Sequence, residues 1–206
     1  GHKNGTLAHG LLYLHHDLPG VEEGRAGLVH RLDKDTSGIL LAAKNESALR
    51  AMMAAFQDRS VEKVYYAILL RTPQTSSGRI DAPLGRHPVM RQKMAIRQQG
   101  GKYAVTKWHV QEHYANGWCL VKIGLETGRT HQIRVHMASQ NTPVAGDTLY
   151  GGTAPPGSGI TPFRQMLHAS SLSFTHPSTG ERLSWTAPLW PDMREVLEQL
   201  RALPEK

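Results

Sequence analysis

The sequence is organised around one polar stretch that lies between two apolar runs. It reads His30-Arg31-Leu32-Asp33-Lys34-Asp35-Thr36-Ser37-Gly38, with Leu28-Val29 before it and Ile39-Leu40-Leu41-Ala42-Ala43 after it. Short apolar runs are typical of buried strands, and a series of Asp, Thr, Ser and Gly is typical of a turn. We therefore predict two core strands joined by a charged turn at the edge of a sheet, where functional residues often lie. An ordinary solvated turn is the alternative.

Composition indicates a globular protein with a polyanionic partner. The chain has 206 residues, of which 39% are hydrophobic and 20% are charged, enough for a substantial core. It carries 24 Lys and Arg against 17 Asp and Glu, a formal net charge of +7. This excess favours nucleic acid as the partner, and an acidic membrane less so. A basic protein without such a partner is the alternative.

Cysteine usage and hydropathy indicate the cellular compartment of the protein. Cys119 is the only cysteine, so no intramolecular disulfide can form, and its apolar neighbours predict a buried thiol. No apolar run approaches the roughly 20 residues of a membrane span, and no targeting segment is recognisable. We expect a cytoplasmic protein, without a membrane partner, that acts as a monomer.

Periodicity predicts three helices. A short helix falls near residues 7–14, and a second over 46–59, with Asn45 as its N-cap and Met52 and Met53 filling the core. The third opens at Pro191-Asp192. Its inner face is formed by Met193, Val196, Leu197, Leu200 and Leu203.

Strand-like runs cover residues 63–71, 79–84, 105–114, 118–126, 167–175 and 183–186. Asn116-Gly117 between two of them is a strong hairpin signal. The order of elements predicts an α+β fold: a single domain over residues 1–206, with a mostly antiparallel sheet flanked by helices.

Residues 85–102 form a predicted loop of unusual charge that contains no acidic residue. Its basic side chains are Arg86, His87, Arg91, Lys93, Arg97 and Lys102. Contact with phosphates explains this composition better than a solvated basic hairpin, which is the alternative.

Motif searches leave one carboxylate as the centre of the chemistry. The 12 histidines include no H-E-x-x-H, and no cysteine pair is present, so we predict no metal. Glycine-rich phosphate loops and a G-x-S-x-G elbow are absent too, so no nucleotide cofactor is implied. Asp33, flanked by Arg31 and Lys34, remains. Asp35 could pair with it as in a glycosidase, but we interpret Asp35 as a turn residue that binds backbone near Thr36 or Ser37.

Residues 30–38 resemble the signature H-R-L-D-x-x-T-S/T-G of the RluA/RluD family of pseudouridine synthases. Residues 63–67 are similar to the family's second motif, basic-x-Tyr-x-Ala, and 126–136 to its third, in which an apolar residue precedes a basic one. Residues 85–88 and 93–95 resemble the RluD branch, and 146–151 and 167–169 also fit. The resemblance covers essentially the whole chain in the right order.

The resemblance implies a role for each site residue. Asp33 would be the essential catalytic residue, Tyr65 would stack on the uracil, and Ile133 and Arg134 would support them, with Arg134 keeping Asp33 ionised. Arg31 would fill the space that a flipped base leaves. The remaining RNA-contacting candidates are Arg86, His87, Arg91, Lys93, Arg129 and His131. The implied activity is isomerisation of uridine to pseudouridine in large-subunit ribosomal RNA, without a cofactor, in a cleft across the sheet.

Family members usually carry an N-terminal S4-type RNA-binding domain and a first strand, and we expect both to be missing here. Two other classes of function stay open. One is a non-catalytic RNA-binding or ribosome-assembly module, which has no need of a carboxylate among its arginines. The other is a nucleoside glycosylase, which would need Asp35 as a second carboxylate.

Overall fold

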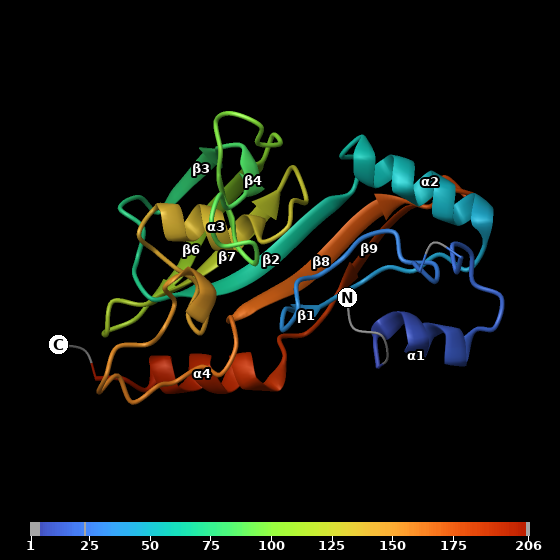
Figure 1. Ribbon diagram of the computed structural model, residues 1–206. Coiled ribbons are helices and arrows are strands. Elements are labelled where there is room, and N and C mark those ends of the chain that lie inside the picture. The colour runs from blue at the N-terminus through green and yellow to red at the C-terminus, as the bar shows by residue number, and fades with distance from the viewer. Residues whose placement is uncertain (1–4, 23, 205–206) are drawn as a thin grey trace.

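A seven-stranded sheet forms the centre of the protein in the computed structural model, which describes residues 5–22 and 24–204 (Figure 1). The strand order is β1-β8-β2-β7-β6-β3, with β9 paired to β8. β1 pairs with β8 in parallel, and all other pairs in this sheet are antiparallel. The strands are β1 (Ser37–Gly38), β2 (Glu62–Leu69), β3 (Ser77–Asp81), β6 (Val105–His113), β7 (Cys119–Leu125), β8 (Leu167–Thr175) and β9 (Arg182–Thr186). The predicted α+β class and mostly antiparallel sheet are confirmed.

Local turn chemistry explains two of the strand pairs. β6 and β7 are joined by the predicted Asn-Gly turn, in which Gly117 has φ +84° and donates to the Tyr114 carbonyl. The side-chain oxygen of Asn116 accepts from the Trp118 amide at 3.1 Å. β8 and β9 pair across residues 176–181, as expected from the polar turn there.

Helices cover both faces of the sheet. They are α1 (Leu7–Leu14), α2 (Glu46–Gln57), α3 (Gln132–Ser139) and α4 (Pro191–Arg201), with a 3₁₀ turn at Thr148–Tyr150. α3 packs Ile133 and Met137 against one face, whereas α4 packs Met193 and Leu197 against the other (Figure 1). Alternation along β2 places Tyr65 in the first layer and Tyr66 in the second, as predicted. The buried Cys119 and the Asn45 cap, which accepts from the Ala48 amide at 2.8 Å, are confirmed as well.

The strands predicted on both sides of the polar stretch were wrong. Residues 28–29 and 39–43 form only one bridge, between Leu28 and Ala42, and the regular strand is Ser37–Gly38 inside the stretch. Gly38 explains this, because it has φ +119° and a Cβ there would lie 2.2 Å from the Ala169 carbonyl oxygen. Only glycine allows this backbone to approach β8 so closely.

Three further predictions need correction. Residues 85–102 contain a two-stranded sheet, β4 (Leu84–Arg86) with β5 (Met94–Ile96), and the strand predicted over 79–84 is Ser77–Asp81. Met53 is 36% exposed, while its neighbour Met52 is buried as expected. Helix α3 was not predicted from the sequence. Six of its eight residues are buried, so the helix lacks the alternation of apolar and solvent-facing sides that marks a surface helix.

Within the described ranges, every helix is too short or too polar to cross a bilayer.

Candidate active site

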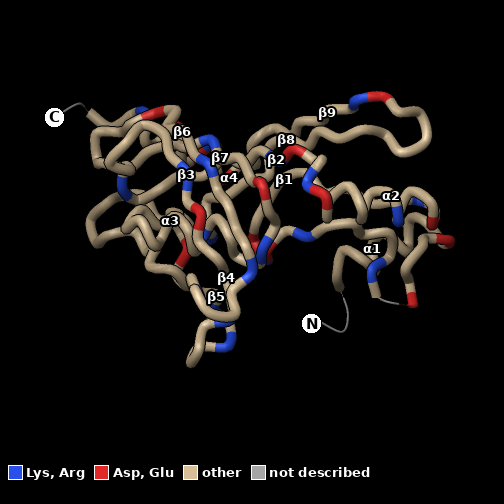
Figure 2. The backbone as a smooth tube through the Cα atoms, turned by 90° about the horizontal axis from the view of Figure 1, so that it is seen from above, with Lys and Arg blue, Asp and Glu red and all other residues tan. Residues whose placement is uncertain are grey.

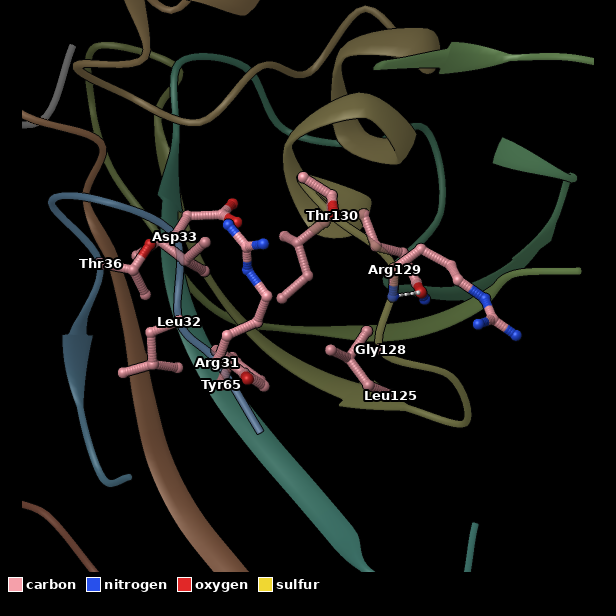
Figure 3. Close-up of a pocket in the computed structure, with 12 residues that line it drawn as sticks. Arg31, Leu32, Asp33, Thr36, Tyr65, Leu125, Gly128, Arg129 and Thr130 are labelled. Carbon is pink, nitrogen blue, oxygen red and sulfur yellow. Dashed lines mark hydrogen bonds between the residues drawn. The ribbon is translucent and has the colours of Figure 1, made fainter. Parts of the chain in front are cut away.

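Asp33 lies in a pocket that the polar stretch forms with the face of the sheet that α3 covers. Arg31, Asp33 and Tyr65 lie on one side of it, and Leu125 and Arg129 on the other (Figure 3). The other lining residues are Leu32, Thr36, Gly128, Thr130, Gln132, Ile133 and Leu167. The Asp33 side chain is 14% exposed. The pocket therefore brings together residues from four separate parts of the chain.

Asp33, Arg134 and Tyr65 form the centre predicted from the sequence. Arg134 Nη1 lies 3.5 Å from Asp33 Oδ2. Burial, followed by the negative charge of Asp33, raises the pKa of Tyr65 to about 12. Tyr65 is thus a neutral phenol at pH 7, suited to stacking on a base or donating a hydrogen bond.

Asp147, the second partner of Arg134, was not among the site residues predicted from the sequence. Its carboxylate accepts from Arg134 Nε at 2.7 Å and from Nη2 at 2.9 Å, and its side chain is 1% exposed. Burial opposes the charge of Arg134, but the hydrogen bonds to Asp147 and the charges of Asp147 and Asp33 raise its pKa overall. The Tyr150 ring lies 5.1 Å from this guanidinium. One fixed cation therefore lies between two carboxylates.

A buried glutamine fixes the segment before Arg134. The Gln132 oxygen accepts from Thr127 Oγ1 at 2.7 Å and from the Arg129 amide at 2.9 Å, and its nitrogen donates to the Val105 carbonyl. His131 enters α3 with φ +55°. These bonds hold residues 127–132 against the sheet and orient the first turn of α3.

Arg164 and Gln165 hold the polar stretch from the other side. Arg164 donates to the Asp35 carbonyl at 3.0 Å and to Ser37 Oγ at 3.1 Å, and Asp192 at the start of α4 binds the same guanidinium at 2.6 and 2.7 Å. The Gln165 nitrogen donates to the Lys34 carbonyl at 2.6 Å. The turn that carries Asp33 is thus anchored through its backbone.

Asp35 takes part in this anchoring in a way the sequence did not predict. It has φ +67°, and its carbonyl accepts from Arg164. Its carboxylate accepts no hydrogen bond from the described residues, so the expected bond to Thr36 or Ser37 was wrong. The Thr36 amide donates to the Asp33 carbonyl at 3.0 Å instead.

The predicted RNA-contacting residues fall into two groups, apart from His131, which lies at the start of α3. Arg31 and Arg129 line the pocket, as does the supporting residue Ile133. The basic residues Arg86, His87, Arg91 and Lys93 lie on the β4–β5 hairpin, which protrudes from the body without an acidic residue (Figure 2).

The hairpin is tied to the pocket by Tyr150. Tyr150 Oη accepts from the Met94 amide at 2.8 Å and lies 2.7 Å from His131 Nδ1. Lys93 Nζ lies 5.9 Å from the Tyr150 ring. Part of the basic hairpin is also engaged internally, since Arg86 donates to the Arg91 carbonyl and His87 accepts from two backbone amides.

The histidines serve mainly as backbone and side-chain partners. His30 accepts from the Leu41 amide, His136 contacts the Ala82 carbonyl, and His168 contacts Ser37. Across residues 5–22 and 24–204, no three His, Cys, Asp or Glu residues gather where they could hold a metal ion.

Comparison with known proteins agrees with this architecture. Residues 14–139 match the family described as RNA pseudouridylate synthase. The ribosomal large subunit pseudouridine synthase D of Pseudomonas aeruginosa is 45% identical over 210 residues, which cover 98% of this chain and 64% of the relative. The uncharacterized RNA pseudouridine synthase YlyB of Bacillus subtilis is 45% identical over 202 residues, covering 98% and 65%.

A solved structure is similar as well. Human RNA pseudouridylate synthase domain containing 1 superposes with a TM-score of 0.66 at 32% identity, over 87% of this chain and 81% of that one. The chain therefore belongs to the RNA pseudouridylate synthase family, which confirms the resemblance to RluA and RluD proteins. It spans less than two thirds of the length of the two bacterial relatives.

Proposed function

We propose that this protein converts uridine to pseudouridine in RNA, with large-subunit ribosomal RNA as the substrate. The observation that carries the proposal is the Asp33 carboxylate, 3.5 Å from Arg134 and beside Tyr65 in one pocket. Membership of the family supports the reaction. The name of the Pseudomonas aeruginosa relative, a ribosomal large subunit pseudouridine synthase, supports the choice of ribosomal RNA.

The reaction needs an anion beside the anomeric carbon. The bond between N1 of uracil and the sugar breaks, the base turns, and a bond forms between C5 and the sugar, while the C5 proton leaves and N1 gains one. Asp33 supplies the carboxylate as a nucleophile or as a partner for a developing positive charge. The Arg134 guanidinium lies 3.5 Å from it as a positive neighbour. No oxidant or energy source is required, because substrate and product are isomers.

The other site residues position the nucleotide. Tyr65 stacks on the uracil, and Ile133 closes the apolar side of the pocket. A base in folded RNA must leave its stack first, and Arg31 occupies the space that it leaves. The basic hairpin, Arg129 and His131 contact the surrounding RNA.

Two other functions compete with this proposal. A pure RNA-binding module would leave the Asp33–Arg134 pair without a purpose. A nucleoside glycosylase would need a second carboxylate in the pocket, and Asp35 does not line it. Ribosomal RNA as the substrate places the protein in the cytoplasm. We expect the protein to act as a monomer.

Release of tritium separates the three functions. Ribosomal RNA carrying tritium at C5 of uridine is incubated with the protein, and both free tritium and free uracil are measured. A synthase releases tritium without uracil, a glycosylase releases uracil, and a binding module releases neither. Absence of tritium release from ribosomal RNA by the folded protein would refute the proposal.

A further inference from the structure

A second cavity adjoins the Asp33 pocket on the side of α2. Its volume is about 280 Å³, and it shares Arg31, Tyr65 and Arg129 with that pocket. Residues that line only this cavity include Phe56 in α2, Arg59 after α2 and Lys63 in β2. Four of its lining residues are Lys or Arg, and none of the described residues that line it is acidic.

Lys63 is the most unusual of these cations. It is 8% exposed, and no hydrogen bond or ion pair joins its ammonium to any other residue in the described chain. The Lys63 Nζ atom lies 5.7 Å from the centre of the Phe56 ring. Burial and the charge of Arg59 lower its pKa.

The other buried cations show how unusual this is. The side chains of Arg134 and Arg164 are each 8% exposed, and each is bound to a buried or nearly buried carboxylate. The Lys63 side chain is largely buried, but its ammonium keeps contact with solvent, so an anion that enters the cavity can reach it. Burial and the charge of Arg59 disfavour the charged form of Lys63, and a bound anion would stabilise it.

Two arginines are held in place around this lysine by Tyr103. The Arg59 guanidinium lies 4.8 Å from the Tyr103 ring, and Arg129 Nε donates to the Tyr103 carbonyl at 3.0 Å. Among the described residues, neither guanidinium group has a carboxylate partner. The stacked pair His30–Phe56, with ring centroids 4.7 Å apart, also lines the cavity.

We propose that this cavity binds a phosphodiester of the RNA strand, next to the nucleotide held by Asp33, with Lys63 as its central cation. The inference rests on the proposed function for the identity of the strand. The shared walls Arg31 and Tyr65 place this phosphate on the target uridine or on the adjacent nucleotide. Arg59 and Arg129 contact the same phosphate from its two sides.

Salt dependence of RNA binding tests the site. Dissociation constants for a short uridine-containing single-stranded RNA are measured over a salt series for the wild type, Lys63→Met, Lys63→Arg and the control Lys122→Met. Lys122 is an exposed strand lysine on the face of β7 opposite Ile123. We expect Lys63→Met to weaken binding about tenfold at low salt. The slope of log K against log salt should fall by about 0.7, the contribution of one phosphate contact on a single strand.

The variants distinguish a lost phosphate contact from damaged packing. Lys63→Arg should keep most of the salt slope, and Lys122→Met should keep all of it. The melting temperature of Lys63→Met should be no lower than that of the wild type. Should Lys63→Met fail to fold, Arg59→Met replaces it with the same expected change in slope. An unchanged slope in the folded variant, with or without weaker binding, overturns the inference.

A chemically altered RNA locates the phosphate. Methylphosphonate linkages remove the charge of one phosphate at a time around the target uridine. When the phosphate that Lys63 contacts is replaced, the wild type and Lys63→Met should bind the RNA with equal affinity. A difference in affinity that persists with every replaced phosphate would contradict the site. Tritium release by the wild type reports separately on the proposed function. Release without a Lys63-dependent slope refutes only the phosphate site, and a Lys63-dependent slope without release refutes only the isomerase.

Discussion

Arg134 forms its two short hydrogen bonds with Asp147, at 2.7 and 2.9 Å, and only a longer contact of 3.5 Å with Asp33. Asp147 thus holds the guanidinium by one edge and leaves another nitrogen directed at Asp33. The proposed catalytic carboxylate shares its cation with a buried structural carboxylate. This arrangement leaves Asp33 near a positive charge without a short hydrogen bond that would restrain it.

Removal of Asp147 should destabilise the fold. We expect Asp147→Ala to lower the free energy of unfolding by about 3–5 kcal/mol, because it leaves a buried guanidinium without its main partner. Urea unfolding measures the loss. Asp81→Ala is the control, since it removes an exposed ion pair with Arg79 and should cost far less stability. Equal losses in the two variants would contradict the structural role of Asp147.

Asp33→Asn should abolish tritium release without preventing RNA binding. We expect turnover to fall by at least about a thousandfold, as for loss of a reacting group. Affinity for RNA should be nearly unchanged. Asp35→Asn serves as the matched control and should keep turnover near the wild type, because its carbonyl and not its carboxylate is used. Substantial turnover by Asp33→Asn would contradict the proposed role of Asp33. A loss of turnover in Asp35→Asn would favour a mechanism with two carboxylates.

Arg31→Ala should affect structured RNA more than flexible RNA. If Arg31 fills the space of an extruded base, its loss matters where that base must leave a stack. We expect about a tenfold greater loss of kcat/KM on a stem-loop than on a single strand, corresponding to about 1.4 kcal/mol. Tritium release from the two RNAs measures it. Equal losses would argue against base extrusion and for simple phosphate binding.

Gly38→Ala should destabilise the fold by at least about 2 kcal/mol. The new methyl group would meet the Ala169 carbonyl oxygen at 2.2 Å, and φ is +119°. Thermal unfolding compares it with Gly124→Ala, a strand glycine whose Cβ would meet nothing within 4 Å. A Gly38→Ala protein as stable as the control would show that β1 need not approach β8 so closely.

His30 should make the protein less stable in mild acid. Burial and the positive charge of Lys63 lower the pKa of His30 from 6.5 to about 4. The unfolded chain then binds the proton more readily than the folded one, so stability falls as pH drops from about 6.5 to about 4. The contribution of this group is at most about 3 kcal/mol. His131, His136 and His168 also have lowered pKa values, so the assignment needs a difference measurement.

The variant His30→Gln isolates that contribution. Urea unfolding is measured at several pH values for the wild type and the variant. The variant should lose less stability between pH 6.5 and pH 4 than the wild type does. Parallel pH profiles would show that His30 is not held neutral by the fold.

Elements governed by local chemistry were predictable. The β6–β7 hairpin follows from Asn116-Gly117, and α4 follows from the spacing of its apolar residues. In contrast, β1 forms because Ser37 and Gly38 pair with His168 and Ala169, about 130 positions later. α3 is buried on nearly all sides, so its sequence lacks the period that marks a surface helix.

By itself the sequence determined the family, the Asp33 signature, the basic character and most of the helices and strands, because these depend on residue type and on spacing along the chain. Tertiary structure alone decided which charges meet. The pairing of Arg134 with Asp147, the anchoring of the Asp33 turn by Arg164 and the gathering of Lys63 and three arginines around one cavity all depend on burial and on the approach of distant segments. Electrostatic energy depends on distance and on access to water, and neither can be read from the order of residues.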